Sequence, residues 1–190
     1  MTLQKVNTRN TVLVLMIVAA AAFRFVSYKY PYVLSNFNPV GAIALFGGAY
    51  FTDKWKAYLV PLLALFVSDI FLNHFYSGKW ELMDPSSIMV YVFFIVMVFI
   101  GSLIKKANVV NVFAVSLVGV VLHWLLTDLP IVGNLYPHTW SGYLQSLTAA
   151  IPFERNMLFG DIVFCAILFG GFELAKSKYT NLRSSQEFAV

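Results

Sequence analysis

Cysteine is almost absent from this chain of 190 residues, in which Cys165 stands alone. A single cysteine excludes an internal disulfide and a metal site built from several thiolates. Cys165 lies inside the apolar run IVFCAILFG, which is typical of a small buried side chain. The sequence therefore predicts no disulfide and no cofactor.

Charged residues are also scarce, because Asp, Glu, Lys and Arg make up 12% of the chain while hydrophobic residues make up 59%. Soluble domains average about 25% charged and roughly 45–50% apolar residues. The 13 basic residues give a net charge of only +4 and are scattered, unlike the clustered cations of a nucleic-acid-binding surface. This composition excludes a soluble domain, a disordered chain and a nucleic-acid partner. It indicates an integral membrane protein embedded in a lipid bilayer.

The apolar residues fall into six segments, and a helix needs about 20 such residues (roughly 17–25) to cross the hydrocarbon layer. The segments are 11–28, 37–52, 57–75, 86–104, 109–129 and 155–176. The first contains Arg24 and is followed by further apolar segments, so we interpret it as a retained helix and not a signal peptide. The predicted fold is an all-α integral membrane protein, a compact bundle of six transmembrane helices. We expect one domain at residues 1–176 and a polar, frayed tail at 177–190.

Two segments differ from simple spans. Segment 37–52 is rich in small residues, and Ala44 and Gly48 have the spacing that lets a neighbouring helix approach closely. The long connection 129–154 contains three prolines and several aromatic residues. We expect this connection to form an ordered cap over one end of the bundle.

The basic residues divide unevenly between the two ends of the predicted bundle. With the N-terminus inside, the cytoplasmic side receives Lys5, Arg9, Lys54, Lys56, Lys105, Lys106, Lys176, Lys178 and Arg183. The outer side receives Arg24, Lys29, Lys79 and Arg155. Because cytoplasmic loops carry an excess of Lys and Arg, both termini are predicted to be cytoplasmic.

Polar residues of the predicted helices concentrate in the outer half. Asp69 and Asp161 lie deepest, where an unpaired charge costs about 2.5–3.5 kcal/mol or more. We interpret this concentration as an outward-facing pocket; the alternative is that Asp69 or Asp161 pairs with Arg24 and locks the helices together. The candidate substrate-binding residues are Asn36, Asn38, Asp69, Asn73, His74, His123, Asp128, Tyr136, His138, Trp140, Asn156 and Asp161.

The stretches NFNPVGAIALFGGAYF (36–51), VPLLALFVSD (60–69) and YPHTWSGYLQSLTAAIPFERNMLFGD (136–161), followed by ILFGGFEL, resemble a family of small bacterial membrane transport proteins. These proteins are similar to the substrate-binding S components of energy-coupling factor importers. The resemblance implies a six-helix bundle in the bacterial inner membrane that binds a vitamin-like micronutrient from outside. It also implies an energy-coupling transmembrane subunit with ATPases as partner.

One feature departs from that resemblance. S components often dock their partner through an Ala-xxx-Ala ridge on the first helix, whereas here Ala19 to Ala22 are consecutive and Phe23 follows. A solitary transporter is therefore the alternative. Cobalamin is the first candidate substrate, with His74, His123 or His138 as a ligand to its cobalt, since imidazole commonly binds transition metals. Riboflavin, thiamine and other aromatic vitamins suit the aromatic cap equally.

Two further classes of function are weaker alternatives. The acidic residues and histidines could form the acid–base or metal site of an intramembrane enzyme. The chain contains no HExxH pair, GxSxG turn or phosphate-binding glycine loop, so we do not expect an enzyme. A scaffold within a cell-envelope complex is the other alternative.

Overall fold

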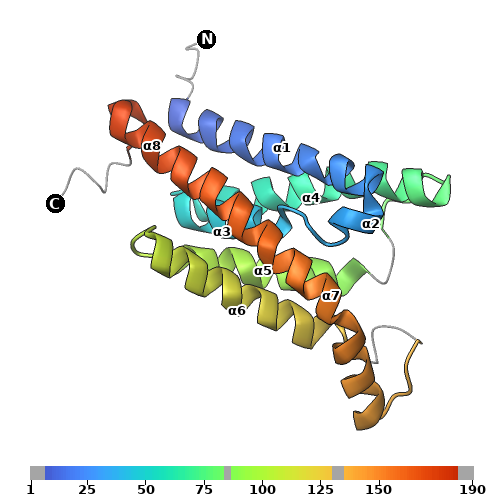
Figure 1. Cartoon of the computed structure of the whole chain (residues 1–190). Helices are drawn as coiled ribbons and strands as arrows, with labels where there is room; N and C mark the ends of the chain where they lie inside the picture. The colour runs from blue at the N-terminus through green and yellow to red at the C-terminus, as the bar shows by residue number, and fades with distance from the viewer. Residues whose placement is uncertain (1–6, 84–86, 130–134, 184–190) are drawn as a thin grey trace.

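The computed structural model describes residues 7–83, 87–129 and 135–183, and within these ranges the chain is helical and contains no strand (Figure 1). The all-α prediction is confirmed for these residues. The elements are α1 (Thr8–Lys29), α2 (Pro31–Leu34), α3 (Val40–Tyr50), α4 (Lys54–Ser77), α5 (Ile88–Ser102), α6 (Val109–Thr127), α7 (Trp140–Cys165), a π-helical turn (Ala166–Gly170), α8 (Gly171–Lys178) and a 3-10 turn (Thr180–Leu182).

The short helix α3 forms the centre of the bundle and contacts α1, α4, α5, α6 and α7. Ala42, Leu45 and Phe46 are fully buried, which agrees with a sequence that is apolar on every side of this helix. Its 11 residues span about 16 Å at 1.5 Å per residue, roughly half of a 30 Å hydrocarbon layer. α3 is therefore a half-length helix surrounded by longer ones.

Glycines allow the backbones of α3 and α5 to approach each other closely. A Cβ atom added at Gly48 would lie 2.1 Å from the carbonyl oxygen of Val98. One added at Gly101 would lie 2.4 Å from the carbonyl oxygen of Leu45. The close approach expected from the small residues of this segment is thus present at Gly48, and α5 is the neighbour concerned.

The two ends of the described chain meet at one end of the bundle. The Arg9 Nε at the start of α1 donates a hydrogen bond to the carbonyl oxygen of Leu182 at 3.0 Å. Residues 52–54 and 102–108 lie at the same end, which we call the basic end. The opposite end, where α1, α4 and α6 finish, is called the aromatic end. Lys5 lies outside the described residues, and the other basic residues predicted to be cytoplasmic lie at or beside the basic end.

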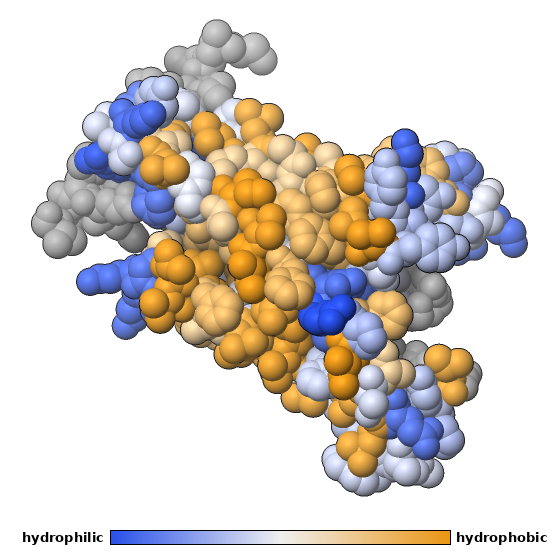
Figure 2. All heavy atoms as spheres, viewed as in Figure 1, coloured by the Kyte–Doolittle hydropathy of each residue, from blue (hydrophilic) through white to orange (hydrophobic). Residues whose placement is uncertain are grey.

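Hydrophobic side chains cover the sides of the molecule between these ends. Figure 2 shows a broad hydrophobic surface in the middle and hydrophilic residues gathered towards both ends. In the described part of the chain, four helices are long and apolar enough to cross a membrane: Thr8–Lys29, Lys54–Ser77, Val109–Thr127 and the continuous helix Trp140–Lys178. A hydrophobic surface of this extent marks a membrane or protein contact. Together with the four candidate spans, it indicates a membrane protein.

The prediction of a cap over residues 129–154 is wrong for residues 140–154. These residues form the first part of α7, which continues without a break into the predicted span 155–176. Thr139 caps the helix, because its side chain accepts a hydrogen bond from the Gly142 N–H at 3.2 Å. Pro152 lies inside α7, where proline typically bends a helix, and Figure 1 shows the first part of α7 turned away from the bundle. Residues 130–134 of the expected cap lie outside the described residues.

The described part of the predicted tail packs against the bundle. α8 continues to Lys178, and the following 3-10 turn buries Leu182, which is 4% exposed. Arg9 donates a hydrogen bond to the carbonyl oxygen of Leu182. The expected frayed tail therefore does not begin at Ser177; residues 184–190 lie outside the described residues.

Candidate functional site

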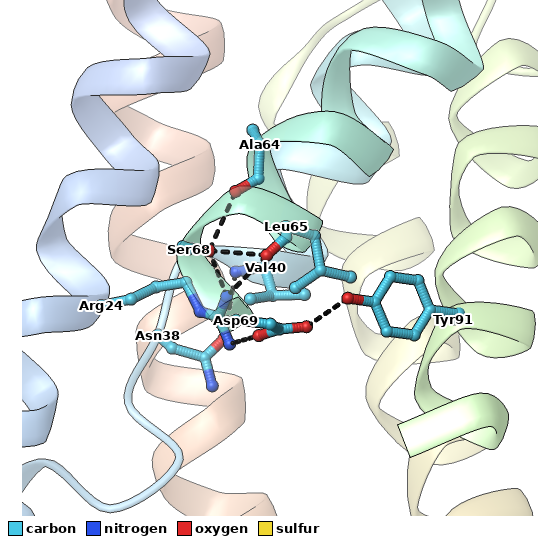
Figure 3. Close-up of polar contacts among 8 residues, drawn as sticks. All are labelled: Arg24, Asn38, Val40, Ala64, Leu65, Ser68, Asp69 and Tyr91. Atoms are coloured by element: carbon cyan, nitrogen blue, oxygen red, sulfur yellow. Dashed lines mark hydrogen bonds and ion pairs between the residues drawn. The ribbon is translucent and has the colours of Figure 1, made fainter. Parts of the chain in front are cut away.

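Three helices contribute to a charged cluster at the junction of α1, α4 and α5 (Figure 3). The Arg24 guanidinium lies 2.6 Å from one carboxylate oxygen of Asp69, and the Tyr91 hydroxyl donates to the other at 2.5 Å. Arg24 also donates to the Leu65 carbonyl oxygen at 3.3 Å and to the Ser68 hydroxyl. Asp69 thus pairs with Arg24, as the alternative interpretation of the sequence proposed. The side chains of Arg24 and Asp69 keep 16% and 17% exposure, so the pair is partly accessible.

An aromatic groove lies beside α1 and α4, two of these three helices, towards the aromatic end. Its volume is about 670 Å³, and it is lined by Tyr28, Lys29, Tyr30, Pro31, Tyr32, Val33, Phe75 and Tyr76. The Tyr28 hydroxyl donates to the Phe75 carbonyl oxygen at 3.0 Å, and the Tyr28 ring meets Tyr76 edge-on with centroids 4.7 Å apart. The groove is therefore formed by aromatic side chains of α1, α2 and α4.

The groove and the charged cluster follow one seam between α1 and α4. Arg24 and Tyr28 are four residues apart on α1, and both contact α4, so they share one face of the helix. Four residues correspond to about 6 Å of helix rise. The charged cluster consequently lies about one helical turn deeper than the groove.

A non-helical segment, residues 35–39, lies beside this seam and leads into α3. Figure 3 places Asn38 next to Arg24 and Asp69, and the Asn38 side chain accepts a hydrogen bond from the Val40 N–H at 3.0 Å. Ser27 donates to the Phe37 carbonyl oxygen at 2.7 Å, and Asn156 donates to that of Ser35 at 3.0 Å. Side chains of α1 and α7 thus satisfy backbone groups that a helix would have paired internally.

Asp161 of α7 is fully buried at the N-terminal end of α3. One carboxylate oxygen accepts from the Ala42 N–H at 3.1 Å, and the other accepts from the Ser116 hydroxyl of α6 at 3.3 Å. A Cβ atom at Gly41 would lie 2.5 Å from this carboxylate, so glycine makes room for it. The first N–H groups of a helix lack partners within the helix and favour a negative group. Asp161 therefore joins α3, α6 and α7.

A second polar group connects α6 and α7 nearer the aromatic end. His123 Nδ1 lies 3.0 Å from one carboxylate oxygen of Glu154, whose side chain is only 8% exposed. The other Glu154 oxygen is buried and has no hydrogen-bond partner within the described ranges. Ser146 of α7 donates to the carboxylate of Asp128, the residue that follows α6, at 3.3 Å. The structure thus pairs His123, a predicted site residue, with Glu154, and Asp128, another predicted site residue, with Ser146.

The other predicted site residues are spread over the aromatic half of the molecule. His74 stacks on Trp80 with ring centroids 4.0 Å apart, and Asn73 precedes it on α4. Asn36 is exposed at the turn after α2 and has a φ of 57°, a left-handed conformation that asparagine tolerates. Tyr136 and His138 lie in the connection before α7.

Trp140 is the first residue of α7 and is 72% exposed, with its ring 5.7 Å from that of Tyr143. His74 belongs to α4, His123 to α6 and His138 to the connection before α7, so the histidines are on separate elements. Within the described ranges, no group of three or more His, Cys, Asp or Glu side chains is placed to hold a metal ion.

Several residues of the site escaped the sequence reasoning. Tyr91 and Ser116 lie within apolar runs, where a tyrosine or serine carries no pattern of its own. The groove residues have a visible signal, the aromatic clusters YKYPY (28–32) and FY (75–76), but such clusters are equally typical of membrane interfaces. Their convergence depends on the pairing of α1 with α4.

Nearly the whole chain matches one known protein family. Residues 4–183 match the model of a family described as a family of unknown function, DUF6580, and the chain belongs to this family. No curated protein and no solved structure matches the chain.

Proposed function

We propose that this DUF6580 protein is a six-span protein of the bacterial inner membrane that binds a vitamin-like solute from the outer side and mediates its uptake. Four of the spans are the long helices described above, and α2–α3 and α5 supply the other two. The termini lie in the cytoplasm, because the basic end carries the excess of Lys and Arg. The sequence resemblance to S components supports the same function, with a coupling subunit as partner or as a solitary transporter.

The observation that carries this proposal is the partly accessible Arg24–Asp69 pair below the aromatic groove. Ionisable residues within membrane helices are costly and commonly mark the path or binding site of a solute. The pair stands next to the broken segment 35–39, and interrupted helices are typical of binding sites in transporters. Aromatic rings at the entrance and a charge pair one turn deeper suit a planar solute with polar substituents.

The dimensions of the groove favour a compact aromatic vitamin over cobalamin. A volume of about 670 Å³ falls within the range of roughly 300–1,000 Å³ that holds drug-sized ligands. Riboflavin and thiamine are small enough to fit within this volume, whereas a corrinoid is considerably larger. A thermal-shift screen of the purified protein against riboflavin, thiamine and cobalamin tests the proposal, because a bound ligand stabilises the folded state.

Reporter fusions test the topology. We expect fusions after Lys106 and after Arg183 to report a cytoplasmic location, and a fusion after Gly78 to report the outer side. The reason is that Lys106 and Arg183 lie at the basic end, while Gly78 follows α4 at the aromatic end. An outer location for Lys106 or Arg183 would contradict both the orientation and the entry of solute through the groove.

Tyr32→Ala is expected to weaken binding of the vitamin found in the screen by about 2- to 10-fold, because one ring contact contributes roughly 0.5–1.5 kcal/mol. Tyr32 lines the groove and is 101% exposed, so the substitution should leave the melting temperature of the ligand-free protein unchanged. Binding is measured by titration calorimetry in detergent.

Tyr179→Ala is the matched control, since Tyr179 is an exposed tyrosine (64%) near the basic end. Its binding constant should equal that of the wild type. Equal affinities of Tyr32→Ala and wild type would remove the groove from the binding site. Failure of every vitamin to shift the melting temperature would overturn the proposed substrate class.

A further inference from the structure

A second cavity lies at the basic end and is separate from the aromatic groove. It has a volume of about 1000 Å³ and opens among the start of α1, the end of α3, the start of α4, the α5–α6 connection and α8. Figure 2 shows hydrophilic residues gathered over the end of the molecule where α8 finishes and α6 begins. None of the residues assigned to solute binding lines this cavity.

Positive charge dominates the cavity. Its basic lining residues are Arg9, Lys54, Lys105, Lys106 and Lys176. Glu173 is the acidic residue of the lining, and it is engaged by Lys176 at 3.0 Å and by the Tyr50 hydroxyl at 2.5 Å. Lys54, Lys105 and Lys106 are exposed and form no ion pair with any residue in the described ranges. Three lysines thus remain available to an external anion.

The cavity also has an apolar wall. Residues from three helices supply it, including Ala49 and Phe51 at the end of α3, Ala57 of α4, and Phe99 of α5. Thr52, Ser102 and Asn108 add uncharged polar groups to the same lining. The lining therefore combines cationic and hydrophobic residues within one cavity, as an anion joined to a hydrocarbon portion requires.

We propose that this cavity binds an anionic phospholipid, with the phosphate of its headgroup at Lys54, Lys105 and Lys106 and the start of its acyl chains along the apolar wall. Basic cavities between membrane helices at the cytoplasmic surface are suited to anionic headgroups, and each Lys near the surface contributes about 1 kcal/mol. A free phosphate would gain nothing from the apolar wall. The inference requires the chain to lie in a membrane but does not depend on solute uptake.

Native mass spectrometry of the full chain in detergent, titrated with phosphatidylglycerol or phosphatidylcholine, tests the proposal. We expect preferential retention of phosphatidylglycerol. The variant Lys105→Gln/Lys106→Gln should bind it roughly 30-fold more weakly, since each lysine contributes about fivefold. The control variant Lys79→Gln/Lys178→Gln changes the net charge equally at exposed lysines outside the cavity lining and should bind as the wild type does.

The rescue variant Lys105→Arg/Lys106→Arg keeps both charges and should restore the affinity. If the glutamine variant does not fold, weakening of phosphatidylglycerol binding to the wild type by added salt serves as the second measurement. Equal retention of the two lipids, or equal losses in the cavity and control variants, would overturn the proposal. Displacement of the lipid by inorganic phosphate at comparable concentration would also overturn it, in favour of a soluble anion. A negative vitamin screen leaves each of these results unchanged.

Discussion

Asp161→Ala is expected to lower the free energy of unfolding by about 3 kcal/mol or more and to reduce the yield of folded protein. The substitution removes the acceptor for the Ala42 N–H and the Ser116 hydroxyl, both of which are buried. Leaving a buried polar group without a partner costs about 1–3 kcal/mol, and the space vacated by a fully buried side chain adds to this. The measurement is equilibrium unfolding in detergent micelles, followed by intrinsic fluorescence.

Two further variants serve as comparisons for Asp161→Ala: one conservative substitution at the same position and one substitution of an exposed aspartate. Asp161→Asn keeps an acceptor oxygen of nearly the same position and should lose less stability than alanine. Asp53→Asn changes an exposed acid at the basic end, whose ion pair with Lys56 contributes at most about 1 kcal/mol. If Asp161→Ala unfolded as the wild type does but failed to bind the solute, the pocket role first inferred from the sequence would hold and the joining role would be wrong.

Gly48→Ala is expected to destabilise the protein by about 3 kcal/mol or more, although alanine is the better helix former. The added Cβ would lie 2.1 Å from the Val98 carbonyl oxygen and 2.9 Å from the Ser102 nitrogen. Both are backbone atoms of the α5 region, so α3 and α5 would have to separate along their contact. Overpacking of this kind typically costs about 1–3 kcal/mol and occasionally more, and here it involves the central helix of the bundle.

Gly119→Ala is the matched control. Its added Cβ would meet the end of the flexible Met97 side chain, 2.2 Å from Cε, and that chain can move aside. Both substitutions gain the same helix propensity, about 1 kcal/mol, so their difference measures the α3–α5 contact. We expect Gly119→Ala to stay within about 1 kcal/mol of the wild type in the same unfolding experiment. Similar stability of the two variants would contradict the close approach.

The limits of sequence reasoning are clearest in α7. Pro152 and the residues before it resemble a loop, because proline removes a backbone donor and Gly142 and Pro137 favour turns. Hydrogen bonds between α6 and α7 instead stabilise this region as a helix. Trp124 donates to the Leu147 carbonyl oxygen at 2.9 Å, and Tyr143 donates to that of Leu125 at 2.8 Å. These contacts join residues far apart in the chain, and no local pattern contains them.

Asp69 and Asp161 likewise show the difference between what a local sequence pattern indicates and what contacts between distant residues decide. Their depth in apolar segments was evident from the sequence, and so was Arg24 as a candidate partner. Helical spacing alone could not assign the partner, because Asp69 and Asp161 were equally deep. The packing of α1 against α4 brings Arg24 to Asp69, and the end of the half-length helix α3 brings the Ala42 N–H to Asp161.

The sequence by itself determined the helical class, the apolar segments and the gathering of basic residues at one end, since these depend on composition and on the order of residues along the chain. The tertiary structure decided the central place of α3, the partners of the buried charges and both cavities. Each of these arises where side chains from three or more helices converge, and the energy of such a contact depends on distances between residues that the chain order leaves undetermined.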